Sequence, residues 1–222
     1  MTYKDIVFDI DGTLIDTEDA MLLALQKAVY AAQGAKWELE DLRFIFGMTA
    51  EDALRRLGIQ DVGSAASMWK DYYLKDTSGV HVFPGMEGVL QELRARSYRL
   101  GILSSKTREE YETDFLPFGL GGYFDVLILA EDSAQHKPDP EPMQAYLRRS
   151  GAIASEVLYI GDTVYDMQCA RAAGVDCALA LWGSRDPQGI EATYCFAGPE
   201  DVLKVLARDA AGESKRVVSR RP

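Results

Sequence analysis

Carboxylates are concentrated near the start of the chain, directly after the apolar run formed by residues 6–8. Asp9 and Asp11 are separated by one residue, and Asp16 and Glu18 follow within the segment VFDIDGTLIDTEDA. Charge is costly at the end of a buried strand unless it is paired or binds a cation. Carboxylate oxygens suit Mg²⁺, and a carboxylate can act as a nucleophile. Asp9 and Asp11 therefore indicate metal-assisted chemistry, whereas Asp16 and Glu18 lie further along and are assigned to a hinge.

Polar residues also follow three later apolar runs. They are Ser104-Ser105 after residues 100–103, Lys137 after residues 126–129, and Gly161-Asp162-Thr163 after residues 157–160. Each one alone matches ordinary turn chemistry. Ligands of open parallel sheets bind beyond the carboxyl ends of the strands, so we expect these residues to converge on Asp9. Asp166, four residues beyond Asp162, is expected to share a helix face with it.

The elements that must hold these residues alternate between short apolar runs and longer amphipathic segments. Strands are predicted at residues 6–8, 100–103, 126–129, 157–160 and 175–181. Helices are predicted at residues 86–96, 141–149 and 164–173. This alternation predicts an α/β fold with a Rossmann-like core built on a parallel sheet.

The region after the first strand breaks this alternation. Helices are predicted at residues 18–32, 39–46, 50–57 and 65–74, with Asp16-Thr17 as the N-cap of the first. No strand run is evident before Val80, so a helical insert of about sixty residues is expected. We place an α-helical cap domain at residues 17–81 and the core at residues 1–16 and 82–222.

Composition limits the classes of function. The 222-residue chain has a formal net charge of −11, which disfavours nucleic acid and anionic membrane surfaces as partners. Its three cysteines have no CxxC spacing, and we expect reduced thiols in a cytoplasmic protein. We see no signal peptide and no membrane-spanning run. A monomer or homodimer is expected, with a frayed basic tail at residues 210–222.

Four motifs together carry a family resemblance. The string DIDGTLIDT, the strand-terminal Ser104, Lys137 and the string GDTVYD resemble the haloacid dehalogenase (HAD) superfamily of hydrolases. The match runs from Asp9 to about Gly183, with the motifs in order. The resemblance implies a Rossmann-like core with a mobile helical cap inserted after the first strand. Trp182-Gly183 resembles a segment of phosphoglycolate-phosphatase-like members.

The resemblance and the residue chemistry together imply a Mg²⁺-dependent phosphatase that acts on a small phosphorylated metabolite. Phosphate monoesters hydrolyse extremely slowly without a catalyst, so a large electrostatic contribution is needed. Asp9 is expected to attack phosphorus and form an aspartyl-phosphate. Asp11 is expected to protonate the leaving oxygen and later to deprotonate the attacking water.

The other site residues divide into three groups. Metal ligands are expected from the side chains of Asp9 and Asp162 and from the backbone carbonyl of Asp11, with Asp166 orienting the metal's waters. Phosphate binding is expected from Ser104, Ser105 and Lys137. Substrate contacts from the cap are expected in the segment LRFIFGMTAED, at Arg43, Gly47 and Thr49.

Three alternatives remain open. A phosphomutase of the β-phosphoglucomutase type shares the nucleophile and the acid, but such enzymes have a Ser-Arg pair in the cap loop where this chain has Thr49-Ala50. A 2-haloacid dehalogenase lacks the acid two residues after the nucleophile and needs no metal. A non-catalytic binding module on the same scaffold would be expected to have lost a motif residue, and none is lost here.

Overall fold

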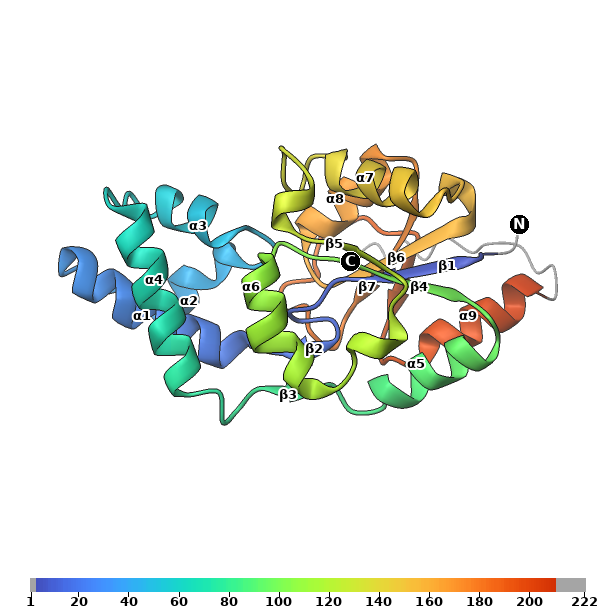
Figure 1. Cartoon of the computed structure of the whole chain (residues 1–222), viewed down its shortest axis with the longest axis horizontal. Coiled ribbons are helices and arrows are strands. Elements are labelled where there is room, and N and C mark those ends of the chain that lie inside the picture. The colour runs from blue at the N-terminus through green and yellow to red at the C-terminus, as the bar shows by residue number, and fades with distance from the viewer. Residues whose placement is uncertain (1–2, 211–222) are drawn as a thin grey trace.

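A six-stranded parallel sheet forms the centre of the protein in a computed structural model, which describes residues 3–210 (Figure 1). The strand order is β5-β4-β1-β6-β7-β8. The strands are β1 (Asp5–Phe8), β4 (Arg99–Leu103), β5 (Val126–Ile128), β6 (Val157–Gly161), β7 (Asp176–Ala180) and β8 (Tyr194–Phe196). The five predicted strands are confirmed. The edge strand β8 was not predicted, because three residues with an exposed centre form no recognisable apolar run.

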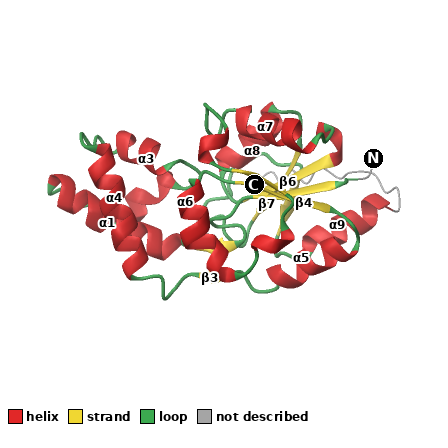
Figure 2. Ribbon diagram, viewed as in Figure 1, coloured by secondary structure: helices red, strands yellow, loops and turns green. Residues whose placement is uncertain are grey.

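Helices cover both faces of this sheet (Figures 1 and 2). They are α5 (Met86–Ala95) and α9 (Asp201–Ala210) on one face and α7 (Glu141–Ser150) and α8 (Val164–Ala172) on the other. Shorter helical segments lie in the loops: α6 (Arg108–Glu110), η2 (Tyr111–Phe115), η3 (Leu116–Phe118), η4 (Gly121–Tyr123), η5 (Ala130–Asp132) and η6 (Ala154–Glu156). The predicted helices at residues 86–96, 141–149 and 164–173 are confirmed, and the α/β fold class with them.

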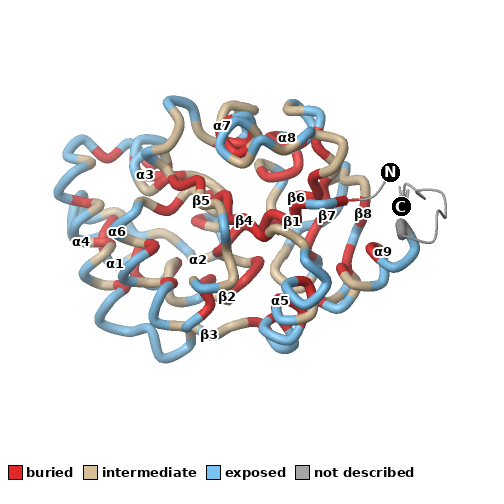
Figure 3. The backbone as a smooth tube through the Cα atoms, turned by 45° about the vertical axis from the view of Figure 1, so that its right-hand side comes forward, coloured by how far each residue is buried: buried red, intermediate tan, exposed pale blue. Residues whose placement is uncertain are grey.

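Burial on both sides explains the position of β1 in the middle of the sheet. Ile6 and Phe8 pack into the apolar cluster on the α5 and α9 side, and Val7 packs into the cluster on the α7 and α8 side. Burying each such side chain contributes about 1.5–3 kcal/mol. Figure 3 shows the same pattern, with the strands buried and the outer surfaces of the helices exposed.

The register of β1 determines where the polar residues emerge. Phe8 pairs with Ile102 of β4 and with Ile160 of β6, and all three strands run in the same direction. The residues that follow these strands therefore leave the sheet at one edge. Asp9 and Ser104 lie at this edge.

The helical cap is inserted between β1 and β4, as predicted. Its elements are α1 (Glu18–Gln33), α2 (Leu39–Leu42), η1 (Arg43–Ile45), α3 (Ala50–Arg56) and α4 (Val62–Lys75). They share a core of their own that includes Leu22, Leu25 and Trp69. β2 (Ile15–Asp16) pairs antiparallel with β3 (His81–Val82). The segment that enters the cap and the segment that returns to the core therefore lie side by side. The exact boundaries at 16/17 and 81/82 remain a prediction.

Two cap helices differ from the sequence prediction. The helix expected at residues 39–46 is divided into α2 and the 3₁₀ turn η1, and the backbone is extended at Phe46. α4 begins at Val62 rather than Ala65, because the Asp61 side chain accepts a hydrogen bond from the backbone N–H of Ser64 at 3.0 Å. Such a cap satisfies an otherwise unpaired donor of the first helical turn.

The structure also bears on the expectations drawn from composition. None of the helices within residues 3–210 combines the length and the apolar character that crossing a bilayer requires. No disulfide joins the three cysteines, all of which lie in this described part of the chain. The predicted frayed tail lies, from residue 211 onward, outside the described residues.

Candidate active site

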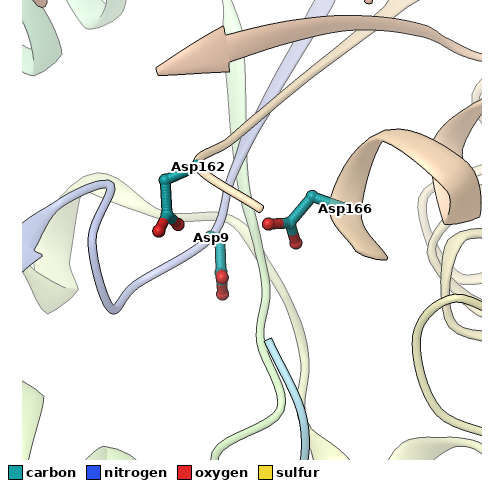
Figure 4. A group of neighbouring side chains, drawn as sticks. All are labelled: Asp9, Asp162 and Asp166. Atoms are coloured by element: carbon teal, nitrogen blue, oxygen red, sulfur yellow. The ribbon is translucent and has the colours of Figure 1, made fainter. Parts of the chain in front are cut away.

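Three buried carboxylates converge at the carboxyl edge of the sheet. Oxygen atoms of Asp9, Asp162 and Asp166 all lie within 4.8 Å of one another. Figure 4 shows that Asp9 and Asp162 come from the segments after two neighbouring strands, while Asp166 extends from the first turn of α8. The predicted convergence of these three residues is therefore present in the structure.

Asp162 and Asp166 come together in a different way from the one predicted. The expectation that they share a helix face is wrong, because α8 begins at Val164 and Asp162 lies in the turn before it. Thr163 is the N-cap. Its hydroxyl accepts from the N–H of Asp166 at 3.3 Å, and the Asp166 carboxylate accepts from the N–H of Thr163 at 3.0 Å. This capping box directs the Asp166 carboxylate back toward the end of β6.

Lys137 lies between two of these carboxylates. Its Nζ is 3.1 Å from Asp9 Oδ2 and 2.7 Å from Asp166 Oδ1, and its side chain is 1% exposed. Burial alone lowers the pKa of a lysine, but Asp166 and Asp9 outweigh this effect and raise the pKa of Lys137 above its ordinary value. Burial likewise opposes ionisation of Asp166, yet the Lys137 ammonium keeps its pKa below the ordinary range. Lys137 and Asp166 therefore form an ionised pair.

One ammonium does not balance three carboxylates. Burial, with the neighbouring charges of Asp166 and Asp11, raises the pKa of Asp9 to about 7 despite the attraction of Lys137. Burial and the charges of Asp166 and Asp9 raise the pKa of Asp162 well above its ordinary value. Asp9 Oδ1 is buried without a hydrogen-bond partner among the described residues. An all-oxygen donor set with three carboxylates and one ammonium fits a divalent cation such as Mg²⁺.

Asp11 lies at the wall of the site and is held by two neighbours. Its Oδ1 accepts a hydrogen bond from Thr17 Oγ1 at 2.9 Å and lies 3.2 Å from Lys106 Nζ. Thr17 is the N-cap residue of α1, as predicted for the Asp16-Thr17 pair, but its side chain makes no cap hydrogen bond. Asp16 does accept from the N–H of Glu18 at 3.2 Å. The Thr17 hydroxyl instead orients the carboxylate of Asp11.

Lys106 is a site residue that sequence reasoning missed. Its side chain is only 6% exposed, and its Nζ lies 3.2 Å from Asp11 and 3.3 Å from Asp114. These two carboxylates raise the pKa of Lys106 although burial opposes the shift. In the sequence Lys106 precedes the polar stretch TREE and resembles any surface lysine. Only its position after Ser104-Ser105 at a strand end was a usable signal.

Trp182 and Gly183 support the turn that carries the first carboxylates. Trp182 Nε1 donates to the carbonyl oxygen of Thr13 at 3.0 Å. A Cβ at Gly183 would lie 1.7 Å from the carbonyl oxygen of Gly12, so only glycine fits there. Gly12 itself has a φ of 73°, which favours glycine. The two segments therefore fix the backbone just after Asp9 and Asp11.

A cavity of about 450 Å³ opens between cap and core beside these carboxylates. Asp9, Asp11, Ser104, Ser105 and Gly47 are among the residues that line it. Ser105 Oγ donates to the carbonyl oxygen of Gly47 at 2.9 Å, so the cap loop touches the core loop at this point. The cavity therefore joins the carboxylate cluster to one of the three predicted cap positions.

Comparison with known proteins identifies the family. The model of the haloacid dehalogenase-like hydrolases matches residues 6–180, which is well over half of the chain. The chain belongs to this family. Pyrophosphatase PpaX of Bacillus velezensis is 26% identical over 204 residues, covering 90% of this chain and 94% of that protein. A phosphoglycolate phosphatase of Aquifex aeolicus is 26% identical over 210 residues, covering 90% of this chain and 95% of that protein.

A solved structure shows the same architecture as this haloacid dehalogenase-like hydrolase. It is a provisionally named phosphoglycolate phosphatase from Lactobacillus plantarum, with a TM-score of 0.84 and 30% sequence identity. The superposition covers 92% of this chain and all of the other. The fold and the inserted helical cap are therefore those of an established family of enzymes.

Two of the three predicted cap contacts in this haloacid dehalogenase-like hydrolase, Arg43 and Thr49, do not line the cavity. Arg43 forms ion pairs with Glu18 and, at 2.6 Å, with Glu40. Thr49 is the N-cap of α3, and its hydroxyl accepts from the N–H of Asp52 at 3.2 Å. Neither residue is among those that line the cavity at Asp9. A substrate contact by Arg43 or Thr49 remains a prediction.

Proposed function

We propose that the chain is a Mg²⁺-dependent phosphatase that hydrolyses a small phosphorylated metabolite through an aspartyl-phosphate on Asp9. The observation that carries this proposal is the buried Asp9 carboxylate. One of its oxygens contacts Lys137, and the other has no hydrogen-bond partner within residues 3–210. The unpaired Asp9 oxygen lies beside Asp162, which supports a cation at this point. The cavity that opens beside Asp9 supports a phosphoryl group there. The relatives named as phosphatases support the reaction class.

The proposed reaction divides phosphate transfer into two steps. In the first step Asp9 attacks phosphorus, the bond to the leaving oxygen breaks, and Asp11 gives that oxygen a proton. In the second step Asp11 takes a proton from the water that attacks the aspartyl-phosphate, which releases phosphate and restores Asp9. Thr17 and Lys106 hold Asp11 in place for both transfers.

The other groups of the site supply charge and hydrogen bonds. Asp9, Asp162 and the backbone carbonyl of Asp11 would hold Mg²⁺, and Asp166 would support the metal's waters. When bound, Mg²⁺ neutralises charge on the phosphoryl group. Lys137, Ser104 and Ser105 would bind phosphoryl oxygens.

Mg²⁺ is expected to stabilise the protein independently of turnover. At about a hundred times its dissociation constant it should add about 2.7 kcal/mol to the free energy of unfolding, which corresponds to a rise of about 5–10 °C in Tm. The cause is the relief of repulsion among buried carboxylates. Thermal unfolding with and without Mg²⁺, reversed by a chelator, measures this. Asp162→Asn should lose most of the Mg²⁺-dependent rise in Tm. Asp71→Asn, which changes an exposed carboxylate, should keep the full rise. A full rise in Asp162→Asn would contradict the assigned metal site.

Asp11→Asn is expected to slow phosphate release by about 10²–10⁴-fold and to leave phosphate on Asp9. An amide cannot take a proton from the attacking water, so the second step should suffer. Rapid quenching followed by intact-mass measurement detects the adduct, and Asp9→Asn provides the control that should carry none. Normal turnover in Asp11→Asn would contradict the assignment of Asp11 as the general acid and base.

A substrate panel tests the proposed function itself. We expect Mg²⁺-dependent phosphate release from phenyl phosphate and from phosphorylated metabolites, and loss of release after complete removal of divalent metal. A phosphomutase would convert a sugar phosphate to its isomer without net release, and a dehalogenase would work without metal. Absence of release across the panel would favour the non-catalytic alternative.

A further inference from the structure

The cavity beside Asp9 is larger than a phosphoryl group requires. Its volume of about 450 Å³ corresponds to about fifteen water molecules at 30 Å³ each. The rest of the space lies between the cap helices and the loop after β4, where the leaving group of a phosphate ester would extend. The chemistry of these walls therefore selects the leaving group.

Charge on these walls is mostly negative. Apart from Asp9 and Asp11, the charged residues that line the cavity are Glu51, Glu109, Glu110, Asp114, Lys70 and Lys106. Four carboxylates therefore accompany two ammonium groups. Lys137 contacts Asp9 from the core side and is not among the lining residues.

Both lysines of the wall already have partners. Lys70 Nζ lies 2.5 Å from Glu109. Lys106 Nζ lies between Asp11 and Asp114, at 3.2 and 3.3 Å, and 5.8 Å from the centre of the Tyr73 ring. An anionic leaving group would have to displace one of these pairs and would then lie beside the released carboxylate.

Besides Glu51, Ser67 and Lys70, the cap side of the cavity is formed largely by apolar side chains. Met21, Ile45, Met48, Trp69 and Tyr73 belong to it. The indole N–H of Trp69 donates to the backbone carbonyl of Met21 at 3.1 Å, so this donor needs no partner from a ligand. Such a wall stabilises an apolar or aromatic group by removing its surface from water.

We infer that the substrate is a phosphate monoester whose leaving group carries no negative charge and has an apolar or aromatic body. This inference rests on the proposed phosphatase function and specifies its substrate class. Pyrophosphate and phosphoglycolate, which give two relatives their names, both have leaving groups with negative charge. The chain is therefore expected to differ from these relatives in substrate.

Three aryl phosphates test the inference on the unmodified protein with Mg²⁺. They are phenyl phosphate, 4-carboxyphenyl phosphate and 4-(aminomethyl)phenyl phosphate. The two substituted compounds are similar in size and opposite in charge. We expect kcat/KM for the carboxylate to be at least about tenfold below that of the other two, because one repulsive contact at intermediate dielectric has this magnitude.

Each result decides the inference. Equal or faster turnover of the carboxylate overturns it, and equally poor turnover of both substituted compounds overturns it in favour of exclusion by size. Phosphate release from none of the three, nor from any other monoester, removes the proposed function and the inference together. The first two results would overturn the inferred substrate class but not the proposed phosphatase function, so the experiment distinguishes the two proposals.

A charge variant adds a second measurement. Glu109→Gln removes the carboxylate that pairs with Lys70. The ratio of kcat/KM for phenyl phosphate to kcat/KM for 4-carboxyphenyl phosphate should therefore fall by at least about threefold. Glu112→Gln is the matched control, because Glu112 is exposed three residues further along and does not line the cavity. Its ratio should equal that of the unmodified protein. An unchanged ratio in folded Glu109→Gln overturns the electrostatic explanation, and if this variant does not fold, the three substrates decide.

Discussion

Replacing Asp9 by asparagine is expected to reduce phosphate release by at least about 10⁴-fold, a loss typical of removing a covalent nucleophile. The amide has nearly the shape of the carboxylate, but it is a poor nucleophile and forms no aspartyl-phosphate. Release of phosphate from phenyl phosphate with Mg²⁺ measures the effect. Asp9 lies after a strand whose four residues are all buried, so the turn that holds it should persist in the variant.

Two controls make this result specific to Asp9. Circular dichroism and thermal unfolding should show a folded Asp9→Asn protein, so that lost activity is not lost structure. Asp19→Asn changes an exposed carboxylate on α1 and should retain full activity. Near-normal turnover in Asp9→Asn would show that another group attacks phosphorus.

Replacing Lys137 by alanine is expected to lower both activity and stability. Without this ammonium, Asp9 and Asp166 remain buried beside Asp162, and no other cationic side chain of the described residues pairs with them. Removing one partner of a buried ion pair typically destabilises a protein by about 3–5 kcal/mol. Urea unfolding of the metal-free protein measures this loss, and Mg²⁺ should restore part of it because the cation also attracts the carboxylates.

Lys137→Met separates charge from volume, since methionine fills most of the space of the lysine stem. If the ammonium charge stabilises the fold, Lys137→Met should lower the free energy of unfolding nearly as much as Lys137→Ala. Lys204→Ala is the surface control, because Lys204 is exposed and should leave both properties unchanged. A folded Lys137→Met protein of full metal-free stability would mean that the three carboxylates do not need this charge.

The ends of the strands were the most predictable part of the site. Apolar runs buried on both faces are recognisable in a sequence, and the pairing of Phe8 with Ile102 and Ile160 brings their ends together. Asp9 and Ser104 therefore reach one edge, as expected. The strand β8 escaped prediction because its middle residue, Cys195, is exposed and its run is only three residues long.

The surroundings of Asp11 were not predictable in the same way. The buried Lys106 contacts Asp114, eight residues later in the chain, and lies over the ring of the cap residue Tyr73. The ion pairs of Arg43 with Glu18 and Glu40 were likewise not predicted from the sequence. The partners of a long charged side chain depend on which segments pack around it, and no local pattern encodes that packing.

The sequence by itself determined the class of fold, the insertion of a helical cap and the set of polar residues at the strand ends, because hydrophobic periodicity and strand-end chemistry are local properties. The tertiary structure decided which charges meet. It brought Asp166 beside Lys137 through a capping box and placed Lys106 beside Asp11. It also paired the lysines of the cavity wall with carboxylates. Electrostatic energies depend on interatomic distances and on burial, and both are fixed only when segments far apart in the chain pack together.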